Sequence, residues 1–135
     1  MDKTVHKTNQ ILKEIEHAQG WSKDRRNWSY DALRAVLHAL RDRLPVDECA
    51  HLSAQLPLLV RGVYYEGWDP SRVPVKMDKK DFLQHVRRGF PYEVEGGTER
   101  LVSTVLDALR RYVAEGEWED IKSSISQDLR PLIPV

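Results

Sequence analysis

The sequence has few of the features that would narrow its function quickly. It contains one cysteine, Cys49, in 135 residues, which excludes an internal disulfide framework and is typical of a reducing compartment. It also has no net charge, because 21 Lys and Arg residues balance 21 Asp and Glu residues with His neutral. Proteins that bind duplex DNA or anionic membranes normally carry a basic excess, so this balance argues against both partners.

Long apolar runs are missing as well. No stretch approaches the roughly 18 to 20 apolar residues that cross a bilayer, and residues 1–10 lack the apolar segment of a signal peptide. We therefore expect a cytoplasmic location. With 41% hydrophobic residues, the length favours a single domain, residues 1–135, that folds around its own core.

Apolar residues recur at helical spacing along the chain, and strict alternation is nearly absent, which predicts an all-α protein. We expect about six helices, starting with one from about residue 4 to 18 that buries Val5 and Ile11. Ser29 is the expected N-cap of the second helix, whose buried stripe begins at Tyr30. The third helix, which buries Leu59, should kink or break near Pro57. The remaining expected helices span about residues 79–88, 98–112 and 117–130, with Thr98 capping the fifth.

The second and third expected helices align with the fifth and sixth at an offset of 69 residues without a gap. Over residues 36–61 and 105–130, the offset gives seven identities: Val36/Val105, Leu37/Leu106, Ala39/Ala108, Leu40/Leu109, Arg41/Arg110, Glu48/Glu117 and Arg61/Arg130. The pattern predicts two tandem three-helix repeats, about residues 4–68 and 78–133, packed on one core. A partner or ligand groove would most naturally lie at the seam between them.

These residues also resemble a known family. The stretch 36–45, followed by Gln55-Leu56-Pro57 and then Tyr64-Tyr65-Glu66-Gly67-Trp68, resembles the bacterial family catalogued as domain of unknown function 2267. The resemblance covers nearly the whole chain. It implies a compact all-helical protein with a globin-like helix arrangement and no established activity, so it supplies no catalytic residue. The second half departs from the family pattern, since Ser124-Ile125-Ser126 stands where the Leu-Pro is often repeated.

The densest candidate site consists of Arg61, Tyr64, Tyr65 and Trp68, which share one face if the helix continues to Trp68. A guanidinium beside three rings could bind a planar or anionic small molecule, or a partner. In the alternative interpretation, Gly67 ends the helix, Tyr64 belongs to the core and Trp68 packs back on it.

A second candidate is the polar connection between two tryptophans, which contains Trp21, Lys23, Arg25, Arg26 and Trp28. Basic residues interleaved with aromatic residues suit a weak single-stranded nucleic-acid site. The alternative is a solvated connection in which the two tryptophans pack against the core.

Neither a metal site nor a catalytic centre is expected. The five histidines lack the i, i+4 pairing and the cysteine clustering of metal sites: His6, His17, His38, His51 and His85. The apolar stripes leave no pocket for haem, Cys49 has the spacing of a buried, inert residue, and no nucleophile or phosphate-binding motif occurs. We expect no cofactor.

The sequence thus favours a non-enzymatic module that binds itself or another protein through apolar and aromatic surface. The first alternative is a small-ligand binder or sensor that uses the Arg61, Tyr64, Tyr65 and Trp68 face. The second is the weak nucleic-acid binder of the loop from Trp21 to Trp28.

Overall fold

The computed structural model describes residues 2–134, and every regular element within them is helical. The α-helices are α1 (Asp2–Gln19), α2 (Arg26–Arg43), α3 (Val46–Gln55), α4 (Leu58–Tyr65), α5 (Lys79–Gly89), α6 (Gly97–Leu109) and α7 (Glu115–Ser124). Short 3₁₀ segments cover Lys23–Arg25, Pro70–Arg72, Arg110–Tyr112 and Gln127–Leu132. The prediction of an all-α chain is confirmed, although the described α-helices are more numerous than the six expected.

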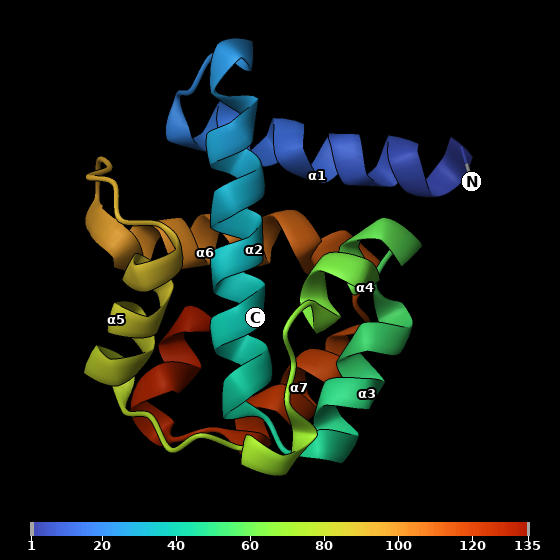
Figure 1. The fold of residues 1–135 in the computed structure, drawn as a ribbon, viewed down its shortest axis with the longest axis vertical. Coiled ribbons are helices and arrows are strands. Elements are labelled where there is room, and N and C mark those ends of the chain that lie inside the picture. Colours follow the sequence, from blue (N-terminus) through green and yellow to red (C-terminus); the bar gives the residue numbers. More distant parts are fainter. Residues whose placement is uncertain (1, 135) are drawn as a thin grey trace.

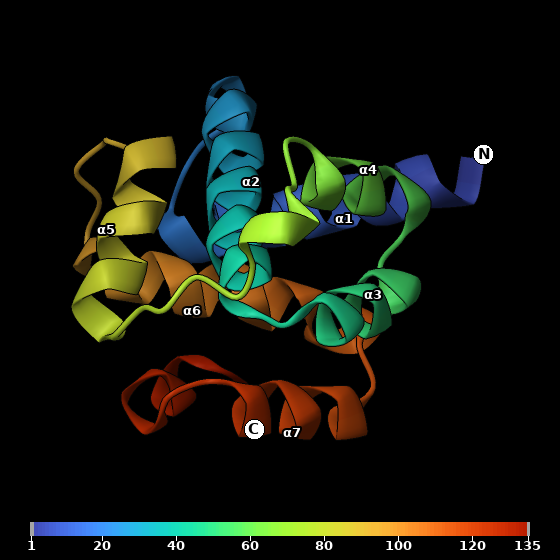
Figure 2. The same cartoon turned by 60° about the horizontal axis from the view of Figure 1, so that its bottom comes forward.

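Helix α2 crosses the middle of the molecule, and α1, α4, α5 and α6 pack around it (Figure 1). Helices α1 and α6 run across α2 and contact each other, while α5 lies along its side. Helix α7 forms a further layer below α6 and contacts α3 (Figure 2). The centre of the core therefore comes from α2, whose fully buried side chains include Val36, Leu37 and Leu40.

The break near Pro57 is confirmed, and the chain breaks again at the aligned place in its second half. Helix α3 ends at Gln55 and α4 begins at Leu58. The single helix expected over residues 117–130 is wrong, because α7 ends at Ser124 and Ile125 is extended, with φ −118° and ψ 165°. Since no proline occurs at this second break, proline is not what ends α7.

Two predicted N-caps are also wrong. Helix α2 begins at Arg26, after a 3₁₀ turn, so Ser29 lies within the helix and is buried. Helix α6 begins at Gly97, one residue before Thr98, and its cap is Gly96 in the left-handed region with φ +84°.

Three residues expected in the buried stripes are exposed: Val5, Tyr30 and Leu59. The break before α4 explains Leu59, because α4 starts in a new direction and buries Val60 and Tyr64. Within residues 2–134, no helix has both the length and the apolar character needed to cross a bilayer.

Gly89 provides a test of the packing between α5 and α2. A Cβ atom at Gly89 would lie 2.9 Å from the Cβ of Ala35, closer than normal contact allows. We expect Gly89→Ala to lower the free energy of unfolding by about 1–3 kcal/mol, because the two helices must move apart. Gly116→Ala in α7 is the control, since nothing lies within 4 Å of its new Cβ. The control should raise stability by up to about 1 kcal/mol. Urea denaturation measures both variants, and equal effects would contradict the close packing.

Candidate functional site

The guanidinium of Arg61 lies against the end of α3. Its Nε donates to the carbonyl oxygen of Ser53 at 2.8 Å, and its Nη2 donates to that of Leu56 at 3.2 Å. The aligned Arg130 repeats the contact at the end of α7, where its Nε donates to the carbonyl oxygen of Lys122 at 3.1 Å. Since the last carbonyls of a helix lack partners within it, each arginine stabilises a helix end.

Both tyrosines of the same candidate site also donate hydrogen bonds within the molecule. Tyr64 is completely buried, and its hydroxyl donates to the carbonyl oxygen of Cys49 at 3.1 Å. The hydroxyl of Tyr65 donates to the Ser53 Oγ at 2.7 Å. Trp68 lies beyond the end of α4, and its ring packs on Tyr65 with centroids 5.2 Å apart. The structure thus has Tyr64 in the core, and the ligand hypothesis for this set stays a prediction.

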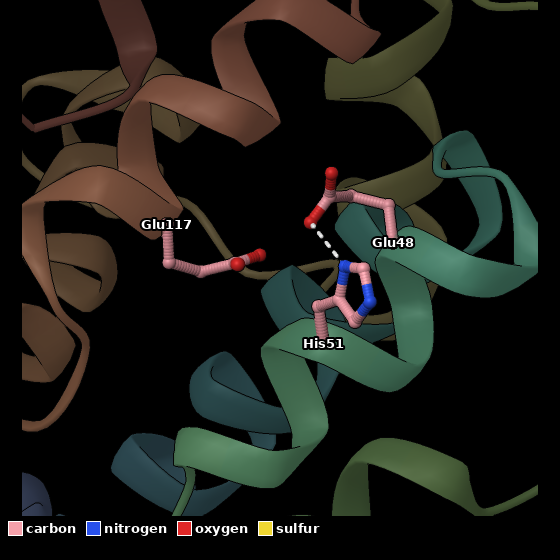
Figure 3. Close-up of side chains that lie close together, drawn as sticks. All are labelled: Glu48, His51 and Glu117. Carbon is pink, nitrogen blue, oxygen red and sulfur yellow. Dashed lines mark ion pairs between the residues drawn. The ribbon is translucent and has the colours of Figure 1, made fainter.

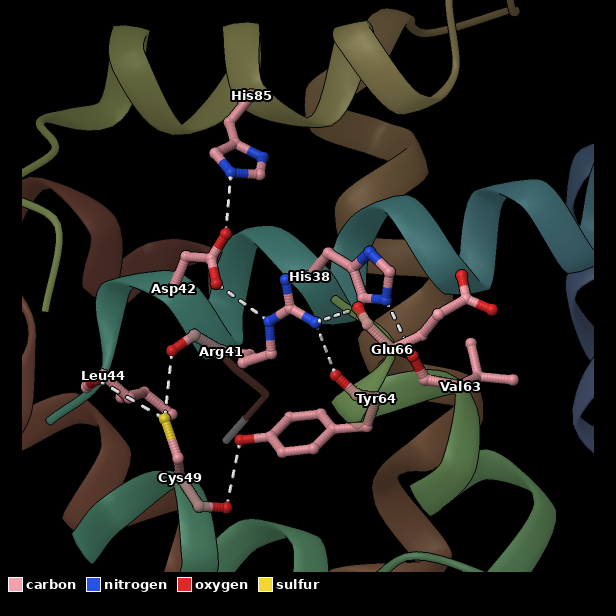
Figure 4. A network of polar contacts seen from close by, with 9 residues as sticks. All are labelled: His38, Arg41, Asp42, Leu44, Cys49, Val63, Tyr64, Glu66 and His85. Carbon is pink, nitrogen blue, oxygen red and sulfur yellow. Dashed lines mark hydrogen bonds and ion pairs between the residues drawn. The ribbon is translucent and has the colours of Figure 1, made fainter. Parts of the chain in front are cut away.

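A buried arginine, Arg41, joins α2 to the end of α4 (Figure 4). Its Nη1 donates to the carbonyl oxygens of Tyr64 at 2.9 Å and Glu66 at 2.7 Å. Its Nε donates to Asp42 Oδ1 at 2.8 Å, and the other oxygen of Asp42 lies 3.1 Å from His85 Nε2 on α5. Although burial opposes it, hydrogen bonds from His85 and Arg41 lower the pKa of Asp42. A continuous series of hydrogen bonds and ion pairs therefore connects α4, α2 and α5.

Two more side chains complete this network. His38 Nε2 lies 2.7 Å from the carbonyl oxygen of Val63, and burial lowers the pKa of the imidazole. Cys49 is fully buried and its Sγ donates to the carbonyl oxygen of Arg41 at 3.0 Å. Burial raises the pKa of the Cys49 thiol, which keeps it protonated at neutral pH. The expected burial of Cys49 is confirmed.

The expected loop from Trp21 to Trp28 is wrong, because Lys23–Arg25 forms a 3₁₀ turn and Arg26 and Trp28 lie in α2. The two tryptophan rings stack on residues that follow α5. Trp21 stacks on Phe90 with centroids 5.8 Å apart, and Trp28 stacks on Tyr92 at 4.9 Å. Arg25 lies over the Trp28 ring, 4.1 Å from its centroid. The Nε of Arg26 pairs with the Glu16 carboxylate at 2.7 Å, while Lys23 is exposed and borders a shallow depression with Asn9 and Lys13. The two tryptophan rings therefore stack on other rings of the same chain. Binding of single-stranded nucleic acid by these residues stays a prediction.

The structure brings together one group that sequence spacing did not indicate: Glu48 and His51 on α3, and Glu117 on α7 (Figure 3). One ligand atom from each residue lies within 4.8 Å of the other two. His51 Nδ1 is 3.7 Å from Glu48 Oε2. The Oε2 atoms of Glu48 and Glu117 are both buried without a hydrogen-bond partner. Burial and the neighbouring Glu48 and Asp120 raise the pKa of Glu117 to about 8.

The sequence contains a signal for the grouping of Glu48, His51 and Glu117. Glu48 and His51 form a Glu-x-x-His spacing, which places both side chains on one face of a helix. The offset of 69 aligns Glu48 with Glu117, and both occupy the third position of their helices. The favourable interaction of a carboxylate with the helix dipole also explains a glutamate in the first turn of each helix. Only the contact between α3 and α7 shows that the two carboxylates face one another.

The model of a family described as uncharacterised conserved proteins, DUF2267, matches residues 8–132. The chain belongs to the DUF2267 family. This confirms the resemblance carried by residues 36–45 and 64–68. No curated protein matches the sequence. Membership in DUF2267 assigns no activity to any residue described above.

Arg61 and Arg130 give a paired test of the arginine caps. Arg61→Ala should lower the free energy of unfolding by about 1–3 kcal/mol, because it leaves partly buried carbonyls without partners. Arg130→Ala should act in the same direction with a smaller effect, because Arg130 is exposed and its cap is worth less in solvent. Arg87→Ala, which removes only an exposed pair with Glu93, is the control and should change stability little. Urea denaturation measures all three, and an unchanged Arg61→Ala variant would show that α3 needs no cap.

The raised pKa of Glu117 predicts how the stability of the fold depends on pH. In the folded protein the Glu117 carboxyl keeps its proton up to about pH 8, whereas in the unfolded chain it loses the proton near pH 4.5, its ordinary pKa. Stability from this group is therefore fully present below pH 4.5 and decreases as the pH rises toward 8. Glu117→Gln should remove this decrease and raise the melting temperature at alkaline pH.

Thermal melts in the presence of a chelator, across this pH interval, measure the effect. The control is Glu119→Gln, which changes a carboxylate that is 63% exposed on the same helix. If Glu117→Gln and Glu119→Gln shift the pH profile equally, the raised pKa of Glu117 is contradicted.

Proposed function

We propose that the protein acts without catalysis as an interaction module whose partner is a second copy of the same chain. The observation that carries the proposal is the outer surface of α4, here named the α4 face, which consists of Val5, Leu58, Leu59 and Gly62. Leu58 is 57% exposed and Leu59 44% exposed, side by side at the start of the helix. Exposed aliphatic side chains are ordinary when single, but a contiguous uncharged group is typical of an interface.

Helix α1 extends this surface. The backbone N–H of Leu59 donates to Thr4 Oγ1 at 3.0 Å, which holds the start of α1 against α4. Val5, the next residue of α1, is 47% exposed. A Cβ at Gly62 would meet nothing within 4 Å, so the middle of the α4 face is open to close approach.

The charges favour a second copy as the partner. Arg61 is the one charged residue within α4 (Leu58–Tyr65), and its guanidinium is bonded to α3 rather than directed to a partner. The α4 face therefore offers no charge to select a charged protein. Since the chain has zero net charge, two copies do not repel each other through net charge, and a twofold interface can place the same apolar face against itself.

We also infer that the chain consists of two tandem repeats, about residues 4–68 and 78–133. Three observations support it. Helix α3 (Val46–Gln55) and α7 (Glu115–Ser124) have the same bounds at an offset of 69 residues, both are followed by an extended residue, and both are capped by the aligned arginine. The α4 face has no counterpart in the second half, because Gln127 and Asp128 align with Leu58 and Leu59.

The two alternatives have less support. The polar groups of Arg61, Tyr64 and Tyr65 bond within the molecule, which leaves little for a small ligand. A depression of about 370 Å³ does lie nearby, but its lining includes Gly67, Asp69 and Arg72 rather than those three residues. The basic residues between Trp21 and Trp28 are partly paired, as Arg26 is with Glu16.

Charge placed on the α4 face tests the proposal. Leu58→Glu and Leu59→Glu should convert the self-associated protein into a monomer, because a carboxylate would lose water at an apolar interface. Val75→Glu is the matched control, since Val75 is 41% exposed and lies outside the α4 face, and it should leave association unchanged. Analytical ultracentrifugation measures the stoichiometry. A wild-type chain that stays monomeric at about 1 mM, where an association of about 4 kcal/mol is half complete, would overturn the proposal.

A further inference from the structure

We propose that the seam between α3 and α7 binds one divalent transition-metal ion, with Glu48, His51 and Glu117 as its protein ligands. The proposal is independent of the α4 face, which shares none of these residues. It reverses the expectation of no metal site, which rested on histidine spacing along the chain.

The geometry of the three side chains carries the proposal. Glu117 extends from α7 toward the Glu48 and His51 pair on α3, and the ligand atoms lie within 4.8 Å of one another (Figure 3). An ion with bonds of about 2.0–2.2 Å needs ligand atoms roughly 3.3 Å apart, so small side-chain rotations bring the group to coordination distance. The two carboxylates come from opposite sides of the seam, and a bound ion would join α3 to α7.

Unpartnered carboxylate oxygens give a second, independent reason. Glu117 is only 6% exposed, and its Oε2 is buried without a hydrogen-bond partner. The Glu48 side chain is 12% exposed, and its Oε2 is likewise buried without a hydrogen bond. Buried polar atoms are almost always paired, so these two oxygens need a partner between them, either a shared proton or a bound cation.

The charge at the seam indicates that this partner is a cation. Within residues 2–134, the ion pair formed by this group is the 3.7 Å contact between Glu48 and His51. Asp120, one turn along α7 from Glu117, adds further negative charge. In the metal-free protein, a proton held by Glu117 relieves the repulsion between the two carboxyl groups. A divalent cation can replace this proton and contact both oxygens.

The ligand types select the class of metal. One imidazole nitrogen with two carboxylate oxygens suits Zn²⁺, Mn²⁺, Fe²⁺ or Co²⁺, whereas Mg²⁺ and Ca²⁺ prefer oxygen ligands throughout. His51 is 65% exposed, so its side of the site is open to solvent and water can complete the coordination. A site with three protein ligands and open positions therefore fits this group.

Zinc titration of the full-length protein, after removal of metals with a chelator, tests the proposal. Isothermal titration calorimetry should show one Zn²⁺ per chain, and a thermal melt should show stabilisation by Zn²⁺ that Mg²⁺ does not reproduce. Co²⁺ should give visible absorption bands, which report coordination by protein ligands directly. Absence of Zn²⁺ binding would overturn the proposal, as would equal stabilisation by Mg²⁺.

Two variants assign the ligands. Glu117→Gln keeps the size of the side chain and should weaken Zn²⁺ binding at least tenfold, and His51→Ala should do the same and also abolish the Co²⁺ bands. The controls are Glu119→Gln on α7 and His17→Ala on α1, both exposed and outside the group, which should bind as the wild type does. Circular dichroism shows whether each variant is folded. Unchanged affinity in folded Glu117→Gln and His51→Ala would mean that zinc binds elsewhere, and the proposal would fail.

Discussion

The rest of the structure depends on the buried guanidinium of Arg41. Helix α4 is short, and the carbonyls of Tyr64 and Glu66 at its end accept hydrogen bonds from Arg41, which supplies donors that the helix itself lacks. The same side chain fixes Asp42, which in turn reaches His85 on α5. A charge this deeply buried is costly unless every donor and its counter-ion are satisfied. The positions of α2, α4 and α5 are therefore coupled through one residue.

This coupling explains why the two sides of α4 have different roles. Its inner side contributes Val60 and Tyr64 to the core, and Tyr64 gives its carbonyl to Arg41 and its hydroxyl to Cys49. Its one charged side chain, Arg61, also turns inward to α3. With its polar groups already bonded inside, the outer side retains Leu58 and Leu59, and it differs from the rest of a surface rich in charged residues.

Hydrophobic periodicity predicts the helical class and much of the core correctly, since Ile11, Leu37, Leu101 and Ile121 are all buried. It fails at the ends of helices. Ser29 has the residue type of a cap but lies inside α2, and the end of α7 depends on a contact that Arg130 makes eight residues away. The candidate site shows the same limit. Spacing places Arg61 beside three aromatic rings, but cannot show that its guanidinium bonds to backbone carbonyls. Nor can it show that Glu48 and Glu117 meet, because that contact depends on how α3 packs on α7.

The two arginine caps also bear on the order in which the chain can fold. Arg61 contacts Ser53, and Arg130 contacts Lys122, across only eight residues of sequence. Loops of about ten residues close in roughly 10–100 ns, with little loss of chain entropy. The bond from Arg41 to Tyr64 spans 23 residues, and contacts between α3 and α7 enclose a far longer loop. The two capped helix ends can therefore form early. The contacts of α3 with α7 and of α1 with α6 form later, because each encloses a long loop; the bond from Tyr112 to Gln10 beside α6 spans 102 residues.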